Sequence, residues 1–430
     1  MPLGNTQTLP PLLIDSKAKT DKRRQILGYP PRNRYKETLD YSVPFASFNR
    51  KVSFMKIRNP LYLICLWLPC FSFAAEPTVS IPLGPQFRIE ETLVSYRGME
   101  GLDYLAFPAI AETGKNEVLL SYKRGKSHAR DNGAVLEIVR VDLESGDIIQ
   151  KPIQLGLPNE IMQMGEWIRF PDGTLATYID AQIVDEGKHA RTGLARSVSL
   201  DNGKSFGPLE RVGPIEGVEY GYLFDSAAIG DRLYALIMTF EYLAGGRRSV
   251  DALYTDDYGA NWRFVKNLSE EFGDIRINES SLMPHGDGFI VATRGYDNMQ
   301  RLHQVDLDFN LIHQKNITED TPAIDSYIGR PRLFVYRGEH FLIGRNWRDR
   351  NRSIPMELGL VRFDPQSFEV ERLYVIDNIE RGKVTDGYYP CPIIVDTGSK
   401  KLLNIFDYRG YLGNPPDIVR LQFDSTEFLQ

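Results

Sequence analysis

The sequence predicts an all-β protein, and three observations support that prediction. The 430 residues include 36 Gly and 26 Pro together with 22 Tyr and 22 Phe, a composition that favours short strands joined by tight turns. The pattern hydroxyl-x-Asp-x-Gly-x-x-aromatic occurs at residues 199–206 and again at 255–262. Each copy follows a β-like run, so we expect each to form a turn between two strands.

The chemistry of this pattern suits a turn. The Asp carboxylate accepts backbone N–H bonds inside the turn, and Gly takes a positive φ at which a Cβ would clash. The hydroxyl can hydrogen-bond locally, and the aromatic ring fills the space beneath the loop. We therefore expect Asp201 and Asp257 to stabilise turns and to take no part in catalysis.

Weakened versions of the pattern recur along the chain at a nearly constant spacing. They lie at residues 142–146, 306–310, 362–366 and 422–425. Over all copies the central acid falls at 144, 201, 257, 308, 364 and 424, in steps of 57, 56, 51, 56 and 60 residues. Six units of about 55 residues, each rich in short strands, predict a six-bladed β-propeller of four-stranded antiparallel blades.

Each unit opens with a hairpin formed by the innermost strand, a tight turn and the second strand. We expect these hairpins at residues 104–124, 162–180, 222–242, 276–295, 328–347 and 387–409. In an up-and-down blade the first–second and third–fourth turns lie at one end. The start of strand one and the end of strand two therefore share the opposite end, where we expect any central site.

The first 75 residues are not expected to belong to the propeller. Residues 1–54 carry ten Lys and Arg against four Asp and Glu, without an apolar period. Residues 55–75 have a basic start, a short apolar run and a final Ala-Ala, which is typical of a signal peptide and too short for a membrane span. Because a signal peptide begins a chain, we interpret 1–54 as a mis-annotated extension that precedes a true start at Met55. The alternative is a genuine disordered basic tail.

The mature domain is then residues 76–430, secreted or periplasmic after cleavage near Ala75, with no membrane span. Residues 1–75 carry a net charge of +8 in a chain whose total is −6, which leaves about −14 for the mature part. Nucleic acid and anionic membranes are therefore not expected partners. Cys391 stands alone after cleavage, so no internal disulfide is expected. No cluster has metal-ligand spacing, and we expect neither metal nor cofactor, and a monomer.

Charged and aromatic residues gather at the predicted central end. Strand-one starts supply Phe107, Gln163, Asp225, Glu279, Arg330 and Tyr389. Strand-two ends supply Arg124, Asp180, Glu241, Arg294, Arg345 and Arg409. Such groups on an axis are costly unless paired or used. They are either inter-blade salt bridges or, because several Arg stand on an acidic domain, a binding site for a carboxylate.

A six-bladed propeller with Asp turns (BNR repeats) and axial Arg resembles the sialidase (neuraminidase) superfamily, over roughly residues 80–430. The run 278–294 is similar to the sialidase hairpin in which a Glu, here Glu279, opens one strand and a triad Arg, here Arg294, closes the next. The run 389–403 is similar to the last-blade hairpin that opens with the nucleophilic Tyr. Tyr389 is that residue, with Tyr388 beside it as the alternative.

The resemblance implies an exo-glycosidase that acts on terminal sialic acid or another acidic sugar of glycans. The sugar bears a carboxylate on its anomeric carbon, which would repel a carboxylate nucleophile. A neutral Tyr, with a Glu accepting its proton, avoids that repulsion. Arginines hold the substrate carboxylate, and a separate acid protonates the leaving oxygen. The resemblance thus implies that Tyr389 is the nucleophile and Glu279 its proton acceptor.

The sequence departs from the family in two places. The Arg of the family's Phe-Arg-Ile-Pro run is absent from residues 105–110, and Lys123 stands where the family has its acid/base Asp. Substitutes lie in the polar loop 123–131, unless that loop is only a solvated basic turn. From it and from the candidates for the third triad Arg (Arg345, Arg350 and Arg352) we predict Asp131 as acid/base, with Arg124, Arg294, Arg345, Arg352 and His128 as substrate-binding residues, His128 being also an alternative acid.

Alternatives to sialidase activity remain open. The chain could be a related acidic-sugar hydrolase or lyase. It could also be a non-catalytic glycan-binding propeller that keeps the pocket and has lost the acid, or a platform for protein interactions. Turnover that depends on the Tyr389 hydroxyl would separate the enzymes from the binding proteins. Ligand binding that survives loss of Arg294 would indicate the protein platform.

Overall fold

The computed structural model describes residues 89–97, 101–239, 249–321, 323–324, 328–346, 356–377, 384–396 and 401–424. All of them lie in one compact unit, Ala75–Gln430. The predicted extension, signal peptide and cleavage position fall outside the described residues and stay predictions. In the part of the chain that is described, no helix has the length and apolar character needed to cross a bilayer.

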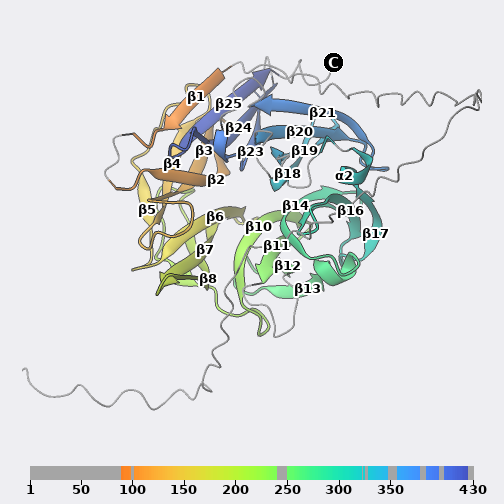
Figure 1. Cartoon of the computed structure of the whole chain (residues 1–430). Coiled ribbons are helices and arrows are strands. Elements are labelled where there is room, and N and C mark those ends of the chain that lie inside the picture. Colours follow the sequence, from red (N-terminus) through yellow and green to blue (C-terminus); the bar gives the residue numbers. More distant parts are fainter. Residues whose placement is uncertain are drawn as a thin grey trace, which may run out of the picture. The chain divides into compact units, whose positions relative to one another are not determined.

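The predicted architecture is confirmed, because six antiparallel sheets stand around a ring (Figure 1). Blade one is β2 (Tyr104–Gly114), β3 (Glu117–Gly125), β4 (Val135–Asp142) and β5 (Ile153–Leu155). Blade two is β6 (Ile161–Arg169), β7 (Leu175–Asp185), β8 (Lys188–Ser199) and β9 (Glu210–Arg211). Blade three is β10 (Tyr220–Ile229), β11 (Arg232–Thr239), β12 (Val250–Thr255) and β13 (Arg263–Asn267), followed by the single turn α1 (Leu268–Glu271).

The second half of the chain repeats the plan. Blade four is β14 (Ile277–His285), β15 (Gly288–Gly295), β16 (Gln300–Asp306) and β17 (Leu311–Asn316), followed by α2 (Ile317–Asp320). Blade five is β18 (Gly329–Tyr336), β19 (Glu339–Asn346), β20 (Glu357–Phe363) and β21 (Val370–Asp377). Blade six is β22 (Val384–Gly387), β23 (Cys391–Asp396), β24 (Lys401–Tyr411), β25 (Asp417–Asp424) and β1 (Ile89–Val94).

Blade six differs from the others in two respects. Its innermost strand is broken into β22 and β23, which both pair with β24. Its outermost strand is β1, from the other end of the described chain, which pairs antiparallel with β25 (Figure 1). Arg420 of β25 reinforces this pairing through an ion pair of 2.9 Å to Glu91 of β1. The ring is therefore closed by residues from both ends of the propeller.

The two strong Asp turns have the predicted hydrogen bonds. Asp201 Oδ1 accepts from the Ser205 backbone N–H at 2.9 Å, and the Ser199 hydroxyl accepts from Gly203 N–H at 2.7 Å. Gly203 has φ of +81°, and a Cβ there would lie 2.2 Å from Leu119 of blade one. The turn therefore needs Gly both for its backbone and for the close approach of the preceding blade.

The weaker copies require a correction. In blades one and four the acid that accepts the backbone N–H groups is Asp142 and Asp306, respectively. Glu144 and Asp308, which we expected as the central acids, each donate a backbone N–H to that carboxylate. The turn closes on the acid at the strand end because its side chain is close enough to cap the following N–H groups.

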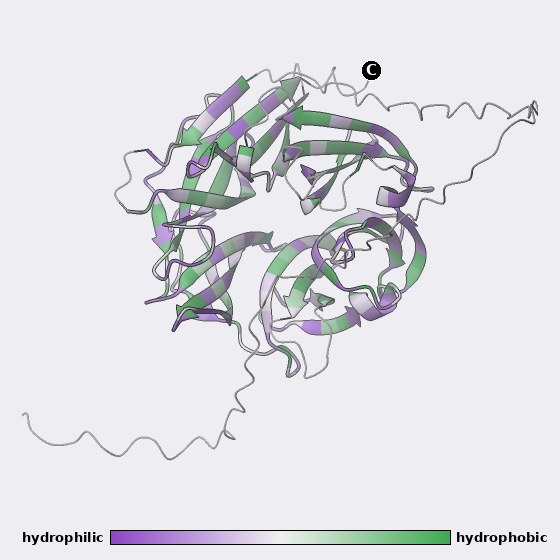
Figure 2. Cartoon of the chain, viewed as in Figure 1, coloured by the Kyte–Doolittle hydropathy of each residue, from purple (hydrophilic) through white to green (hydrophobic). Residues whose placement is uncertain are grey.

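The apolar core lies in seams between neighbouring blades, and hydrophobic and hydrophilic bands alternate along the strands (Figure 2). The seam between blades two and three shows how a turn aromatic contributes. Trp262, after β12, is buried and meets Tyr178 of β7 edge to face, with 5.9 Å between ring centroids. Its Nε1 also donates to the Tyr178 hydroxyl at 3.3 Å.

Trp262→Ala should lower the free energy of unfolding by about 3–5 kcal/mol, because it opens a cavity in this seam. Urea unfolding followed by circular dichroism measures the change. Leu200→Ala, in the neighbouring turn, is the control: Leu200 is 86% exposed, so a change within about 0.5 kcal/mol is expected. Equal stabilities for the two variants would contradict the role given to the turn aromatic.

Candidate functional site

Irregular strand starts bring the functional side chains to the axis. The pairing register of the innermost strand shifts near its start in blades one to five, as between Ile277 and Ser280 of β14. Non-glycine residues at two of these starts take positive φ, Phe107 (57°) and Arg330 (48°), as does Tyr388 (66°) in the break between β22 and β23 of blade six. A bulge turns a side chain away from the regular alternation of a strand. These shifts therefore aim side chains from several blades at one another.

Glu279 is the centre of the resulting cluster. The Tyr389 hydroxyl donates to Glu279 Oε1 at 2.6 Å. The Arg294 guanidinium forms an ion pair with Oε2, and the backbone N–H of Arg330 donates to the same oxygen at 2.8 Å. Glu279, Arg294 and Tyr389 are all buried. Three blades thus supply the groups that bond this one carboxylate.

Arg345 completes the cluster and lies over one face of the Tyr389 ring. Its guanidinium carbon lies 4.6 Å from the centroid of Tyr389, a cation–π contact. Its Nε donates to the Gly387 carbonyl at 2.7 Å and its Nη2 to the Tyr408 hydroxyl at 3.1 Å. A fixed positive charge at this place stabilises negative charge that develops on the Tyr389 oxygen or arrives with a ligand.

The structure distinguishes Tyr389 from its neighbour Tyr388. The Tyr388 side chain is buried in the seam between blades five and six, and its hydroxyl donates to Asp377 Oδ2 at 2.7 Å. Only Tyr389 of the two has its hydroxyl on Glu279. The geometry therefore favours Tyr389 for the role that the sequence left open between them.

A second polar cluster, the rim cluster, lies beside the first and consists of Tyr104, His128, Asp386 and Tyr408. His128 Nδ1 is 2.8 Å from the Tyr104 hydroxyl and 3.3 Å from Asp386 Oδ2. The hydroxyl of Tyr104 donates to Asp386 Oδ2, and that of Tyr408 donates to Oδ1 at 3.2 Å. Burial alone would raise the pKa of Asp386, but His128 and Arg345 lower it to about 2.

The rim cluster is connected to the Glu279 cluster by two contacts. The Tyr408 hydroxyl bonds both Asp386 and Arg345. Phe107 packs against His128 and Tyr389, with ring centroids 5.0 Å and 5.5 Å apart. Phe107 belongs to the run 105–110, from which the Arg of the Phe-Arg-Ile-Pro pattern is absent.

The loop 123–131 uses its charges internally. Asp131 Oδ1 pairs with Lys123 Nζ at 2.7 Å, and Oδ2 accepts from the backbone N–H of Lys126 at 2.7 Å and of Ser127 at 3.1 Å. Arg124 pairs with Glu137 of β4 at 2.8 Å. The structure therefore does not join Arg124 or Asp131 to Glu279, whereas it does place His128 at the rim of the site. Arg350 and Arg352 lie outside the described residues, and their roles stay predictions.

Below the cluster, four charged side chains pair along the axis. Arg330 and Arg332 both form ion pairs with Glu166 of β6, and Arg332 also pairs with Asp225 of β10 at 3.2 Å. Burial and the neighbouring Arg332 lower the pKa of Arg330 to about 10. This network is the salt-bridge arrangement that was the alternative interpretation of the ring. It holds the segment whose Arg330 N–H bonds Glu279.

Sequence reasoning missed several members of the site. Asp386, Tyr104 and Tyr408 were not among the predicted residues, and the backbone contribution of Arg330 was not foreseen. The only signal for Asp386 is its place just before Tyr388 and Tyr389 in the last blade. In the described part of the chain, no group of three or more His, Cys, Asp or Glu side chains could hold a metal ion.

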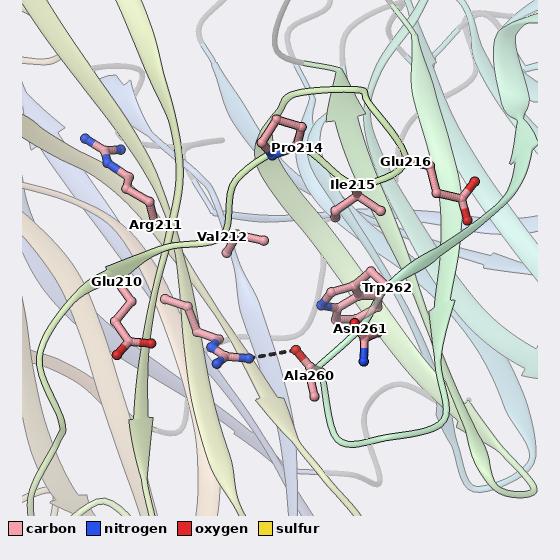
Figure 3. Close-up of a pocket in the computed structure, with 11 residues that line it drawn as sticks. Glu210, Arg211, Val212, Pro214, Ile215, Glu216, Ala260, Asn261 and Trp262 are labelled. Atoms are coloured by element: carbon pink, nitrogen blue, oxygen red, sulfur yellow. Dashed lines mark hydrogen bonds between the residues drawn. The ribbon is translucent and has the colours of Figure 1, made fainter. Parts of the chain in front are cut away.

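A separate cavity of about 310 Å³ lies between blades two and three (Figure 3). Residues 210–216 form one wall, and the turn that carries Trp262 forms the other. Arg196 crosses it to donate to the Gly259 carbonyl at 2.7 Å. None of its lining residues belongs to the Glu279 cluster, so its polar groups serve the packing of the turn.

Comparison with solved structures shows what the fold resembles. A protein of unknown function from Dyadobacter fermentans matches with a TM-score of 0.62 and 15% identity, over 79% of this chain and 99% of its own. The Hadza microbial sialidase Hz136 matches with a TM-score of 0.55 and 10% identity, over 79% and 69%. The K499G mutant of the NanB sialidase from Streptococcus pneumoniae matches with 0.55 and 12%, over 81% and 72%.

These likenesses show a shared fold. The chain has a six-bladed propeller fold like that of these sialidases. No protein-family model matches the sequence, and no curated protein matches it either. The expected resemblance is thus confirmed at the level of the fold.

The buried carboxyl group of Asp407 bonds the backbone of the site, and its burial can be tested through its protonation. Its Oδ1 accepts from the backbone N–H of Tyr389 and of Tyr408, both at 2.8 Å, and its buried Oδ2 has no hydrogen-bond partner among the described residues. Burial raises the pKa of Asp407 to about 8, although the two N–H groups act to lower it. The folded protein therefore keeps this proton over a pH range in which the unfolded chain has released it.

Because the folded pKa is raised, Asp407 lowers stability progressively as pH rises from about 4 to about 8. Asp407→Asn stays neutral and keeps the acceptor oxygen. Its free energy of unfolding should therefore rise relative to that of the wild type, by at most about 1.4 kcal/mol per pH unit in that range. Urea unfolding of both proteins at pH 5, 6, 7 and 8 measures the difference. A difference that is constant with pH, or that shrinks as pH rises, would contradict a protonated Asp407.

Proposed function

We propose that the chain is an exo-glycosidase that removes a terminal acidic sugar, sialic acid or a similar one, from glycans. The observation that carries the proposal is the hydrogen bond of 2.6 Å between the Tyr389 hydroxyl and Glu279. This pair is buried, is flanked by Arg294 and Arg345 and lies at the axis of the ring. The sialidase-like fold supports the same substrate class.

The pair provides a nucleophile without negative charge in the resting enzyme. Tyr389 Oη attacks the anomeric carbon while its proton passes to Glu279 Oε1, which is already within hydrogen-bonding distance. A carboxylate nucleophile would meet the substrate's own carboxylate at that carbon, and the neutral phenol does not. The glycosyl–tyrosine intermediate is then hydrolysed by water, and Glu279 returns the proton to Tyr389.

Arg294 and Arg345 bind the substrate carboxylate in this proposal. Both are buried, Arg294 in an ion pair with Glu279 and Arg345 over the Tyr389 ring, and guanidinium groups match carboxylates in shape and charge. Arg352, predicted as a further binder, stays part of the proposal. Phe107 stands beside Tyr389 in place of an arginine, so the anion is held by fewer charges and an apolar surface faces the sugar.

Wild-type protein should release the fluorophore from a 4-methylumbelliferyl glycoside of sialic acid or of a uronic acid. Tyr389→Phe and Glu279→Gln should each lower kcat/KM by about 10²–10⁴-fold, because the proton transfer between them is lost. Tyr388→Phe is the matched control, since it removes a hydroxyl that bonds Asp377, and it should keep activity. Equal background rates for wild type and Tyr389→Phe would instead indicate a glycan-binding protein without catalysis.

Binding of the free acidic sugar to the Tyr389→Phe protein isolates the role of the arginines. Adding Arg345→Met should weaken binding by about 10–100-fold, because a charged hydrogen bond contributes about 1.5–3 kcal/mol. Arg169→Met is the control, since Arg169 is exposed and bonds Asn202 in another part of the protein. Calorimetry measures both. Unchanged affinity after loss of Arg345 would contradict an anion site at the axis.

A further inference from the structure

We infer that His128 is the general acid of this site and that Asp386 and Tyr104 orient its ring through Nδ1–H, so that Nε2 is the nitrogen that transfers the proton. The inference rests on the proposed function and names the group that protonates the leaving oxygen. The Glu279 cluster contains the nucleophile and its base but no proton donor for the departing glycan. The rim cluster lies beside it, and His128 is its exposed member, with 52% of its side chain accessible.

The hydrogen bonds of the rim cluster determine which ring nitrogen of His128 is held as N–H, and therefore which nitrogen exchanges a proton. The Tyr104 hydroxyl has one proton and donates it to Asp386 Oδ2. Its oxygen, 2.8 Å from His128 Nδ1, must therefore accept, so Nδ1 is the protonated nitrogen. Burial and the charge of Asp386 raise the pKa of Tyr104, which keeps this hydroxyl in its donor form.

The other nitrogen of the ring is left to do chemistry. No residue in the described part of the chain hydrogen-bonds to His128 Nε2. With Nδ1–H held, the imidazole gains and loses its second proton at Nε2. A carboxylate that orients one ring nitrogen so that the other can transfer a proton is the arrangement by which an imidazole is prepared for acid–base work.

The backbone of His128 is held in place by buried polar side chains. Lys123 Nζ donates to the His128 carbonyl at 3.0 Å, and Gln163 Nε2 donates to the same oxygen at 2.7 Å. Asp131 neutralises Lys123 and caps two backbone N–H groups of the loop. Asp131 is thus assigned to positioning. Both its oxygens are occupied and its side chain is 2% exposed, so it offers no proton to a ligand.

His128 lies close to the Tyr389 side of the site, because one aromatic residue contacts both rings. That residue is Phe107, whose ring centroid is 5.0 Å from that of His128 and 5.5 Å from that of Tyr389. The charged and titratable groups that face His128 are Tyr104 of β2, Asp386 of β22, Lys123 of β3 through the carbonyl, and Arg345 of β19 and Tyr408 of β24 through Asp386.

The proton balance closes over the two steps. In the first, the bond from the anomeric carbon to the leaving oxygen breaks, Nε2–H protonates that oxygen, and Tyr389 Oη forms the new bond after giving its proton to Glu279. In the second, water adds its hydroxide to the anomeric carbon and its proton to Nε2. The bond to Tyr389 breaks, and the Tyr389 oxygen takes back the proton held by Glu279. The enzyme returns to its starting state.

Two substrates with the same acidic sugar test the assignment. One carries 4-nitrophenol, a leaving group that departs without protonation, and the other carries an alcohol, such as the hydroxyl of lactose. His128→Gln should lower kcat/KM for the lactose-linked substrate by about 10²–10⁴-fold. For the nitrophenyl substrate it should lower kcat/KM less than tenfold. Asp386→Asn should show the same selectivity to a smaller extent.

The pH profile is the second measurement. With the lactose-linked substrate, wild-type activity should fall toward high pH, because a general acid must carry its proton in order to transfer it. With the nitrophenyl substrate that fall should be weaker, and in His128→Gln it should be absent for both. Circular dichroism and thermal unfolding establish that the variants are folded.

Every other outcome overturns the inference, and each of these outcomes leads to a different conclusion. Equal losses on both substrates in His128→Gln would remove the acid role and leave the proposed function intact. A leaving-group selectivity found in Asp131→Asn and absent from His128→Gln would assign the acid to Asp131. Wild-type protein that cleaves neither substrate would overturn the proposed function, and the general-acid assignment with it.

Discussion

The arrangement of the site depends on the ion pair and the hydrogen bonds of the Glu279 carboxylate. Arg294 of blade four, the Arg330 N–H of blade five and Tyr389 of blade six all bond it. A buried carboxylate is costly unless its lone pairs are satisfied, and these three partners come from three different blades. The site therefore depends on how blades four, five and six are packed around the ring.

The irregular strand starts and the charged side chains on the axis both help to position the residues of the site. Regular strands would alternate their side chains between the two faces of a blade, and none would point along the axis. The register shifts and positive φ values at the strand starts turn Phe107, Glu279 and Arg330 toward the centre. The ion pairs of Glu166 with Arg330 and Arg332 stabilise this backbone from below. The polar groups at the axis are thus divided between support and site.

The features that were predictable from the sequence are local or repeated ones. Asp turns at a constant spacing indicated six blades, because a turn's hydrogen bonds involve residues within four positions, as in Ser199–Ser205. The order of strands within a blade then placed Glu279, Arg294 and Tyr389 at one end. The features that were not predictable depend on distant pairs. Tyr104 and Asp386, which bond each other, stand 282 residues apart. The sequence of the loop 123–131 also does not show whether Lys123 pairs with Asp131 or is exposed on a basic turn; the structure shows the pair.

The most direct test of the central claim is covalent trapping of the nucleophile. A 2-deoxy-2-fluoro-type or 3-fluoro acidic glycosyl fluoride forms the glycosyl–enzyme bond faster than water removes it, and peptide mass spectrometry then locates the sugar. We predict one equivalent of sugar on Tyr389, and none on the Tyr389→Phe protein. A sugar on a different residue, or an unlabelled protein that nevertheless hydrolyses the reagent, would contradict a tyrosine nucleophile held by Glu279.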